Sequence, residues 1–214
     1  MEVIQNRLLA REEKMDEKLE KLELNYIKEI LPEYIHRTIK DNPTLTESLN
    51  YLLESEIEYK NKSAAEGIIR ASNMPFRKTL EDYDFTFQPS VNEKQIRELA
   101  SLSFIERQEN IVFVGNPGTG KTHLAVSLGV EAANHRYSVY FITCHNLMQK
   151  LNKAQKENRL DQQLQHLAQY KLLIIDEIGY LPVDHQGSNL FFQLIAKRYM
   201  NKSRQMKLRR ARNN

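Results

Sequence analysis

The sequence predicts an α/β protein in which a parallel sheet is flanked by helices and preceded by a small all-helical region. Three apolar runs, 111–114, 138–143 and 171–176, alternate with helical patterns, as the strands of parallel sheets do. A glycine-rich stretch follows the first run directly. The chain has 214 residues, of which 41% are hydrophobic, enough for one core. We therefore expect one moderate α/β domain with a helical appendage.

The amino-terminal region, 1–70, shows two amphipathic helical patterns. In the first, apolar residues recur every three or four positions, and Pro32 is expected to end the helix. Thr44 and Glu47 have the spacing of a capping box that opens a second helix. The apolar positions are Met15, Leu19, Leu22, Tyr26 and Ile30 in the first pattern and Leu45, Leu49, Leu52, Leu53 and Ile57 in the second. Both helices must cover their apolar faces, either by packing on each other or by binding a partner protein.

The segment 71–90 is predicted to be a linker. Pro75 and Pro89 bracket an alternating aromatic run in which Tyr83, Phe85 and Phe87 recur at every second position. We expect the aromatic side chains to anchor the linker on the domain that follows, 91–202. A helix over 92–107 then leads to the first strand.

The glycine-rich stretch fills every fixed position of the phosphate-binding pattern G-x-x-x-x-G-K-[ST]. Its residues are Gly115, Asn116, Pro117, Gly118, Thr119, Gly120, Lys121 and Thr122. In this pattern main-chain N–H groups surround the phosphates of a nucleoside triphosphate, and the following helix, 121–136, favours anions at its start. Lys121 supplies a cation to the outer phosphates and Thr122 a ligand for Mg²⁺. The linker aromatics could alternatively contact the adenine base of such a nucleotide.

An acidic pair, Asp176 and Glu177, follows the third strand. An apolar strand places such a pair at the carboxyl edge of the sheet, where open α/β sheets bind ligands. We expect Asp176 to contact the Mg²⁺ shell and Glu177 to orient the water that attacks the γ-phosphate. The sequence thus predicts a P-loop enzyme that hydrolyses a nucleoside triphosphate, with Mg²⁺ as a second ligand and Glu177 and Lys121 as catalytic residues.

Other residues have simpler interpretations. His123 fits a packing or surface position, and Cys144, the single cysteine, fits a small buried apolar position. The histidines lack the spacing of a zinc site. Further helices are expected over 146–170 and 187–200. With neither a membrane-span pattern nor a secretory signal, the protein is expected to be cytoplasmic.

The net charge of +3 is unevenly distributed. Six basic side chains and no acidic one lie in 201–214, so the rest of the chain carries a net charge of −3. A basic tail of this kind, assigned to 203–214, can bind nucleic acid through its phosphates, or it can be a solvated terminus.

Several motifs together resemble one known family, the IstB-type ATP-binding helpers of insertion-sequence transposition. They are the run 79–85, the residues 122–125 that follow the phosphate-binding lysine, and the extension 176–182 with 186–187 and 191–195 after it. The resemblance extends to about Lys202. It implies the AAA+ class of oligomeric ATPases within the P-loop (ASCE) fold, similar to the bacterial replicative helicase loader. The implied partners are double-stranded target DNA, a cognate transposase and further copies of the chain, with ATP-driven assembly on DNA.

The resemblance ends at Ser203. In relatives a strand with a sensor residue, an arginine finger and a helical lid follow, whereas 203–214 has no β-branched apolar run. The expected fold is therefore an incomplete AAA+ core, with a gap in the sheet between strand 111–114 and strand 171–176, and with weak or absent hydrolysis. A helicase-loader role and a non-hydrolysing fragment that acts only by binding remain as alternatives.

Overall fold

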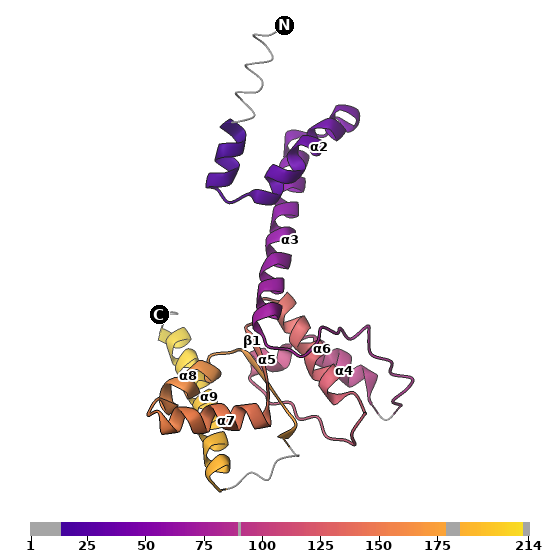
Figure 1. The fold of residues 1–214 in the computed structure, drawn as a ribbon. Helices are drawn as coiled ribbons and strands as arrows, with labels where there is room; N and C mark the ends of the chain where they lie inside the picture. The colour runs from indigo at the N-terminus through magenta and orange to yellow at the C-terminus, as the bar shows by residue number, and fades with distance from the viewer. Residues whose placement is uncertain (1–13, 90, 179–184, 212–214) are drawn as a thin grey trace. The chain divides into compact units, whose positions relative to one another are not determined.

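The computed structural model describes residues 14–89, 91–178 and 185–211 (Figure 1). It divides into two compact units, Met1–Ala64 and Ala65–Asn214, with the boundary inside helix α3. After a helical stretch at 14–21, the elements are α2 (Asn25–Asp41), α3 (Leu45–Ala71), α4 (Glu93–Ala100), α5 (Ser103–Arg107), α6 (Lys121–Asn134), β1 (Val139–Thr143), α7 (Cys144–Lys156), α8 (Leu160–Ala168), β2 (Leu172–Asp176) and α9 (His185–Ala211).

The first unit corrects the prediction that Pro32 ends a helix. Pro32 lies inside α2, on its exposed side. Two stacked ring pairs join α2 to α3, one on each side of the proline: Tyr26 with Tyr59 and Tyr34 with Tyr51, with centroids 4.8 and 5.0 Å apart. These tertiary contacts outweigh the hydrogen bond that proline removes from the helix.

The helical stripe predicted from Met15 to Ile30 is also interrupted, but earlier in the chain. Glu23 adopts a left-handed backbone conformation, φ 56°, and the Leu24 amide returns to the Leu19 carbonyl at 2.9 Å. Helix α2 therefore starts anew at Asn25. Its first turn is capped from a distance, because the Ile27 amide donates to the Glu56 carboxylate at 2.8 Å. Glu56 lies on α3 and is only 3% exposed.

The predicted capping box at the start of α3 is confirmed. The Thr44 amide and hydroxyl each donate to Glu47 Oε2 at 2.7 Å, and the Glu47 amide donates to Thr44 Oγ1 at 3.3 Å. These bonds satisfy amides that a helix leaves unpaired at its start, and they lower the pKa of Glu47.

A parallel pair of strands forms the sheet of the second unit. β1 pairs with β2 in the register Val139↔Leu172 to Thr143↔Asp176. Residues after α3 run along β1: the Phe141 amide donates to the Ser72 carbonyl at 2.7 Å, and the Asn73 amide group donates to the Phe141 carbonyl at 3.1 Å. The predicted strands at 138–143 and 171–176 are thus confirmed to within one residue.

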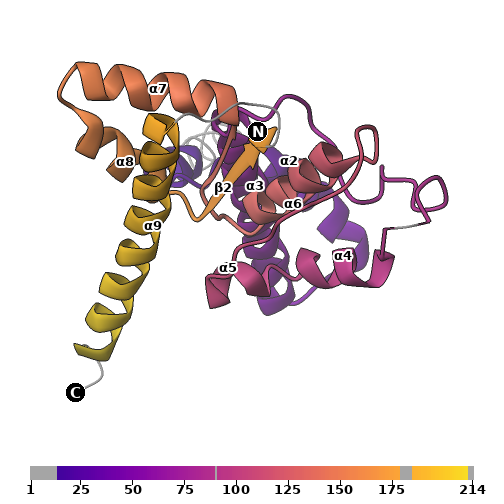
Figure 2. The ribbon, with the colours of Figure 1, turned by 90° about the horizontal axis from the view of Figure 1, so that it is seen from below.

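Helices cover both faces of this sheet, as the sequence predicts. Side chains alternate along β1, so that Val139 and Phe141 face α5 and α6 while Ile142 faces α7, α8 and α9. Figure 2 shows the group α7–α9 on one side of β2 and α6 on the other. The result is a three-layer arrangement with one apolar cluster on each side of the strands.

The predicted first strand, 111–114, is not a strand in the structure. Val112 is 75% exposed and Val114 is 89% exposed, and only Phe113 packs against an apolar cluster. A β-conformation is stable only when a neighbouring strand accepts and donates its main-chain hydrogen bonds. Within the described ranges the sheet contains β1 and β2 alone, so the segment 111–114 has no strand partner there.

Two predicted helices are each divided in the structure. The helix expected over 92–107 breaks at Leu102, whose φ is 59°, into α4 and α5. The helix expected over 146–170 breaks near Asn158, φ 54°, into α7 and α8. The helix expected over 187–200 is α9, which runs from His185 to Ala211, so residues 203–211 of the predicted basic tail are helical; residues 212–214 lie outside the described residues.

Arg198 anchors α9 to the elements beside it. Its guanidinium donates to the carbonyls of Leu167 at 3.2 Å and Tyr170 at 3.0 Å, and to that of Lys171 at 3.4 Å. These carbonyls end α8 and lead into β2, so one cation satisfies acceptors at a helix C-terminus. Burial lowers the pKa of Arg198. Among the described helices none is long and apolar enough to cross a membrane.

Candidate functional site

The glycine-rich stretch forms a loop that leads directly into α6. Gly118 and Gly120 have φ values of 81° and 77°, in the left-handed region that favours glycine. Gly120 is the N-cap of α6 and makes no side-chain capping hydrogen bond. The first amides of a helix have no partner within the helix, so this loop presents N–H groups and the positive end of a helix dipole to an anion.

The Lys121 side chain makes hydrogen bonds back to the start of the loop. Its ammonium donates to the Gly115 carbonyl at 2.9 Å and the Asn116 carbonyl at 2.7 Å, and Thr119 Oγ1 lies 3.5 Å away. The Thr119 hydroxyl also donates to the Asn116 carbonyl at 2.9 Å. A positive charge is therefore held within the turn, with ligands that phosphate oxygens can replace.

The structure brings the two predicted motifs together. The Thr122 hydroxyl donates to Asp176 Oδ2 at 2.8 Å across 54 residues of sequence. Thr122 lies on the first turn of α6, and Asp176 ends β2, so the contact lies at the carboxyl edge of the sheet. Both side chains are half-buried. This is the edge at which open α/β sheets bind their ligands.

Glu177 follows in a conformation that is uncommon for this residue type. Its φ is 61°, and its amide donates to Asp176 Oδ1 at 2.9 Å. The side chain is exposed. A non-glycine residue in the left-handed region carries backbone strain, which is often found where a side chain is held in place for function.

The donor set beside the loop suits Mg²⁺. Thr122 supplies a hydroxyl and Asp176 a carboxylate, and both are hard oxygen ligands. Mg²⁺ is commonly held by one or two protein groups together with phosphate oxygens and water. The described residues contain no cluster of three or more histidine, cysteine or acidic side chains that could hold a metal ion.

The linker packs against the phosphate loop and the start of α6, which confirms the docking role predicted for Tyr83 and Phe85. Tyr83 is 8% exposed and contacts the rings of Phe85 and His123 edge-on, at centroid distances of 4.8 and 5.3 Å. His123 Nε2 lies 3.1 Å from the Thr79 carbonyl, so His123 has the packing role expected of it. Phe87 is 75% exposed and does not share in the docking.

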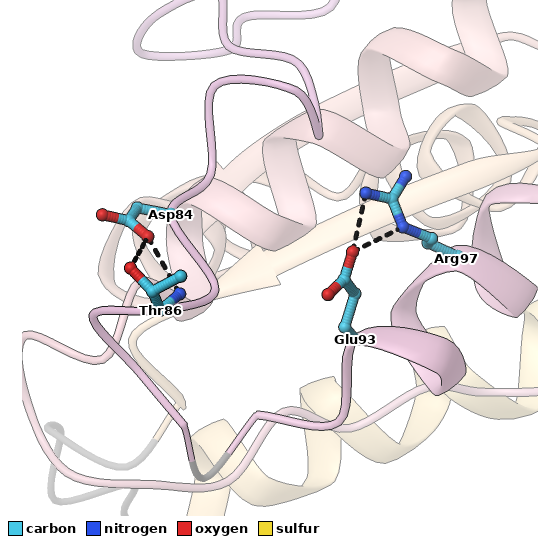
Figure 3. A network of polar contacts seen from close by, with 4 residues as sticks. All are labelled: Asp84, Thr86, Glu93 and Arg97. Carbon is cyan, nitrogen blue, oxygen red and sulfur yellow. Dashed lines mark hydrogen bonds and ion pairs between the residues drawn. The ribbon is translucent and has the colours of Figure 1, made fainter.

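Local hydrogen bonds give the linker its shape. The Thr86 amide and hydroxyl both donate to Asp84 Oδ1, at 2.9 and 2.6 Å, and these bonds lower the pKa of Asp84. Glu93 pairs with Arg97 on the helix that follows, as Figure 3 shows. The Arg97 guanidinium also lies 5.8 Å from the Phe85 ring centroid.

Sequence reasoning missed one contact of the loop. The Tyr83 hydroxyl donates to the Thr119 carbonyl at 2.9 Å. The aromatic alternation predicted that the linker docks, but it carried no signal for the partner, which lies 36 residues away. A Cβ added to Gly120 would lie 2.5 Å from Tyr83 Cε2, so the glycine also makes room for this ring.

A separate hollow of about 440 Å³ lies between α7 and α9. Its lining is mostly apolar and includes Met148, Ile178, Phe191 and Phe192. The phosphate loop contributes no residue to this lining. This lining carries no charged side chain that could pair with phosphate, so we place the candidate anion site at the loop.

The chain is similar in sequence to known proteins. Residues 17–207 match the family of IstB-like ATP binding proteins. The chain is 46% identical over 185 residues to the insertion sequence IS232 ATP-binding protein of Bacillus thuringiensis subsp. berliner, an alignment that covers 86% of this chain and 74% of the relative. It is 48% identical over 158 residues to the IS5376 ATP-binding protein of Geobacillus stearothermophilus, covering 74% and 63%.

A third relative extends the comparison to another genus. The chain is 40% identical over 181 residues to the IS21 ATP-binding protein of Pseudomonas aeruginosa, covering 85% of this chain and 68% of the relative. The chain thus spans between 63% and 74% of the length of these three relatives. The family match includes the phosphate loop, α6 and β2. From this match and these identities, the chain belongs to the family of IstB-like ATP binding proteins.

Proposed function

We propose that this chain binds Mg·ATP at the phosphate loop and serves as an ATP-binding helper of insertion-sequence transposition. The observation that carries the nucleotide assignment is the Thr122–Asp176 hydrogen bond, which joins the two halves of the predicted site at 2.8 Å. In the bound state the loop amides and Lys121 hold the phosphates, Thr122 and Asp176 hold Mg²⁺, and Glu177 orients the attacking water.

The transposition role is supported by the relatives. All three are named as ATP-binding proteins of insertion sequences, which favours this role over loading of a replicative helicase. We propose the cognate transposase and double-stranded target DNA as partners, with several copies of the chain assembling on the DNA. The basic segment of 201–214, helical to Ala211, supplies positive charge suited to DNA phosphates.

We further propose that one copy of the chain hydrolyses ATP slowly. An arginine that contacts the γ-phosphate accelerates such reactions by about 10³ to 10⁵. Several arginines of the second unit have partners away from the loop: Arg77 pairs with Glu66, Arg97 with Glu93, Arg107 with Glu109, Arg159 with Glu157, and Arg198 with main-chain carbonyls. Brisk turnover by a monomer, with or without DNA, would contradict this proposal.

Calorimetry with Mg·ATP tests the nucleotide assignment. Lys121→Ala removes the cation of the loop, and we expect affinity to fall by about tenfold to a hundredfold, as for the loss of charge-assisted hydrogen bonds. Lys153→Ala, an exposed lysine of α7, is the matched control and should bind as the parent does. Helical content, read by circular dichroism, should be unchanged in both variants. Equal ATP affinity in Lys121→Ala and the parent would overturn the assignment.

A further inference from the structure

A buried phenol lies against the phosphate loop on the side of the linker. The Tyr83 hydroxyl donates to the Thr119 carbonyl at 2.9 Å, and the ring packs on Gly120, where a Cβ would lie 2.5 Å from Cε2. Thr119 and Gly120 are the last two residues of the loop before Lys121. Tyr83 thus contacts the loop through both a hydrogen bond and its ring, but it belongs to neither nucleotide motif.

The hydrogen bond fixes the orientation of one peptide plane. The Thr119 carbonyl and the Gly120 amide belong to the same peptide group, and the described chain has no cis peptide bonds. In a trans peptide the C=O and N–H groups point in opposite directions. Because Tyr83 holds the carbonyl toward the linker, the Gly120 N–H is directed away from the linker. Glycine at φ 77° would otherwise leave this plane free to rotate.

The surroundings of Tyr83 keep the phenol in place. The ring makes edge-on contacts with Phe85 and His123, and Tyr83 belongs to an apolar cluster with Leu80 and Leu124. Burial raises the pKa of Tyr83 above the ordinary value of a tyrosine. The hydroxyl therefore stays protonated at neutral and mildly alkaline pH, and remains a donor throughout that range.

We propose that Tyr83 is a positioning residue for phosphate binding, which orients the Thr119–Gly120 peptide so that the Gly120 N–H faces the phosphates of the bound nucleotide. This inference rests on the nucleotide binding proposed above and assigns the linker a part in it. Tyr83 acts through the loop, so its effect extends to any ligand that presents phosphates there. An aromatic contact with the base, the alternative that the sequence left open, would act only on ligands that carry adenine.

The test compares two ligands, Mg·ATP and Mg·tripolyphosphate, by calorimetry on the full chain. Tyr83→Phe removes the hydroxyl but keeps the ring. We expect the affinity for both ligands to fall by the same factor, about three- to tenfold, as for the loss of one hydrogen bond. Tyr137→Phe is the matched control, because its hydroxyl contacts Glu106 at 3.4 Å, outside the phosphate loop, and it should bind as the parent does.

The outcomes separate this inference from the proposed function. If the parent binds neither ligand, both are overturned. If the parent binds ATP and Lys121→Ala does not, but Tyr83→Phe binds as tightly as the parent, only the role of Tyr83 is overturned. A loss confined to ATP would also overturn it, because that result indicates contact with the base. A fall in melting temperature without a change in either affinity would show a purely structural role and overturn it too.

Discussion

A methyl group added at Gly120 should destabilise the chain far more than one added at Gly118. Both glycines have left-handed backbones, with φ values of 77° and 81°. An alanine in this region costs about 1–2 kcal/mol relative to glycine. A Cβ on Gly118 meets nothing within 4 Å, so Gly118→Ala should cost only this backbone term.

Gly120→Ala has a second cost, because its Cβ would lie 2.5 Å from Tyr83 Cε2, whereas ordinary contacts begin at 3.4 Å. The ring must move by about 1 Å, which stretches its hydrogen bond to Thr119. Losing that bond costs about 1 kcal/mol and overpacking about 1–3 kcal/mol. Together with the backbone term, we therefore expect a total loss of about 3–6 kcal/mol for Gly120→Ala.

Urea unfolding of the second unit, followed by circular dichroism, measures both losses. The effect of alanine on the unfolded chain is the same for both variants and cancels in the comparison. When Tyr83 is already replaced by alanine, Gly120→Ala should lower the free energy of unfolding by little more than Gly118→Ala does, because the clashing ring is gone. Equal losses for Gly118→Ala and Gly120→Ala would refute the reasoning, as would strict additivity in the double variant.

Two further predictions concern other parts of the chain. Arg198→Met leaves three carbonyls without their donor and should lower the free energy of unfolding in urea by about 2–4 kcal/mol, while Arg198→Lys should recover part of this loss. Arg159→Met, a change at an exposed arginine, is the control and should stay within about 0.5 kcal/mol of the parent. A similar loss in Arg159→Met would contradict the anchoring role of Arg198. The Glu47 cap should depend on pH, because its pKa is lowered in the folded chain: its contribution is complete above the unfolded pKa of about 4.3 and is lost as pH falls through the folded value. Thr44→Ala should reduce the helicity of α3 at neutral pH, and this difference from the parent should shrink in acid; a difference that does not vary with pH would argue against the capping bond.

Local signals in the sequence predicted the elements whose stability is set locally. The capping box of Thr44 and Glu47 works within one helical turn, so its residue types and spacing were sufficient. The runs that became β1 and β2 were predicted correctly because each strand has the other as its hydrogen-bonding partner. The loop 115–122 was recognisable because its pattern of residue types is fixed.

The errors arise where distant residues decide the local conformation. The segment 111–114 consists of side chains that favour strands, but a strand forms only beside a neighbouring strand, and the residue types of the segment cannot reveal whether one is present. Pro32 would end an isolated helix, yet tyrosine pairs on both sides of it hold α2 to α3. The contact between Tyr83 and Thr119 likewise depends on the path of the linker, which no local pattern encodes.

The long-distance cap at Glu56 has a consequence for folding cooperativity. Its carboxylate belongs to α3, but the amide that it accepts belongs to Ile27, 29 residues earlier. The Ile27 amide therefore has the Glu56 carboxylate as its acceptor only while α3 is formed. Likewise, Glu56 receives this hydrogen bond only while the first turn of α2 is formed. Loss of either helix exposes the other to fraying, so the two should melt in a single transition at one temperature.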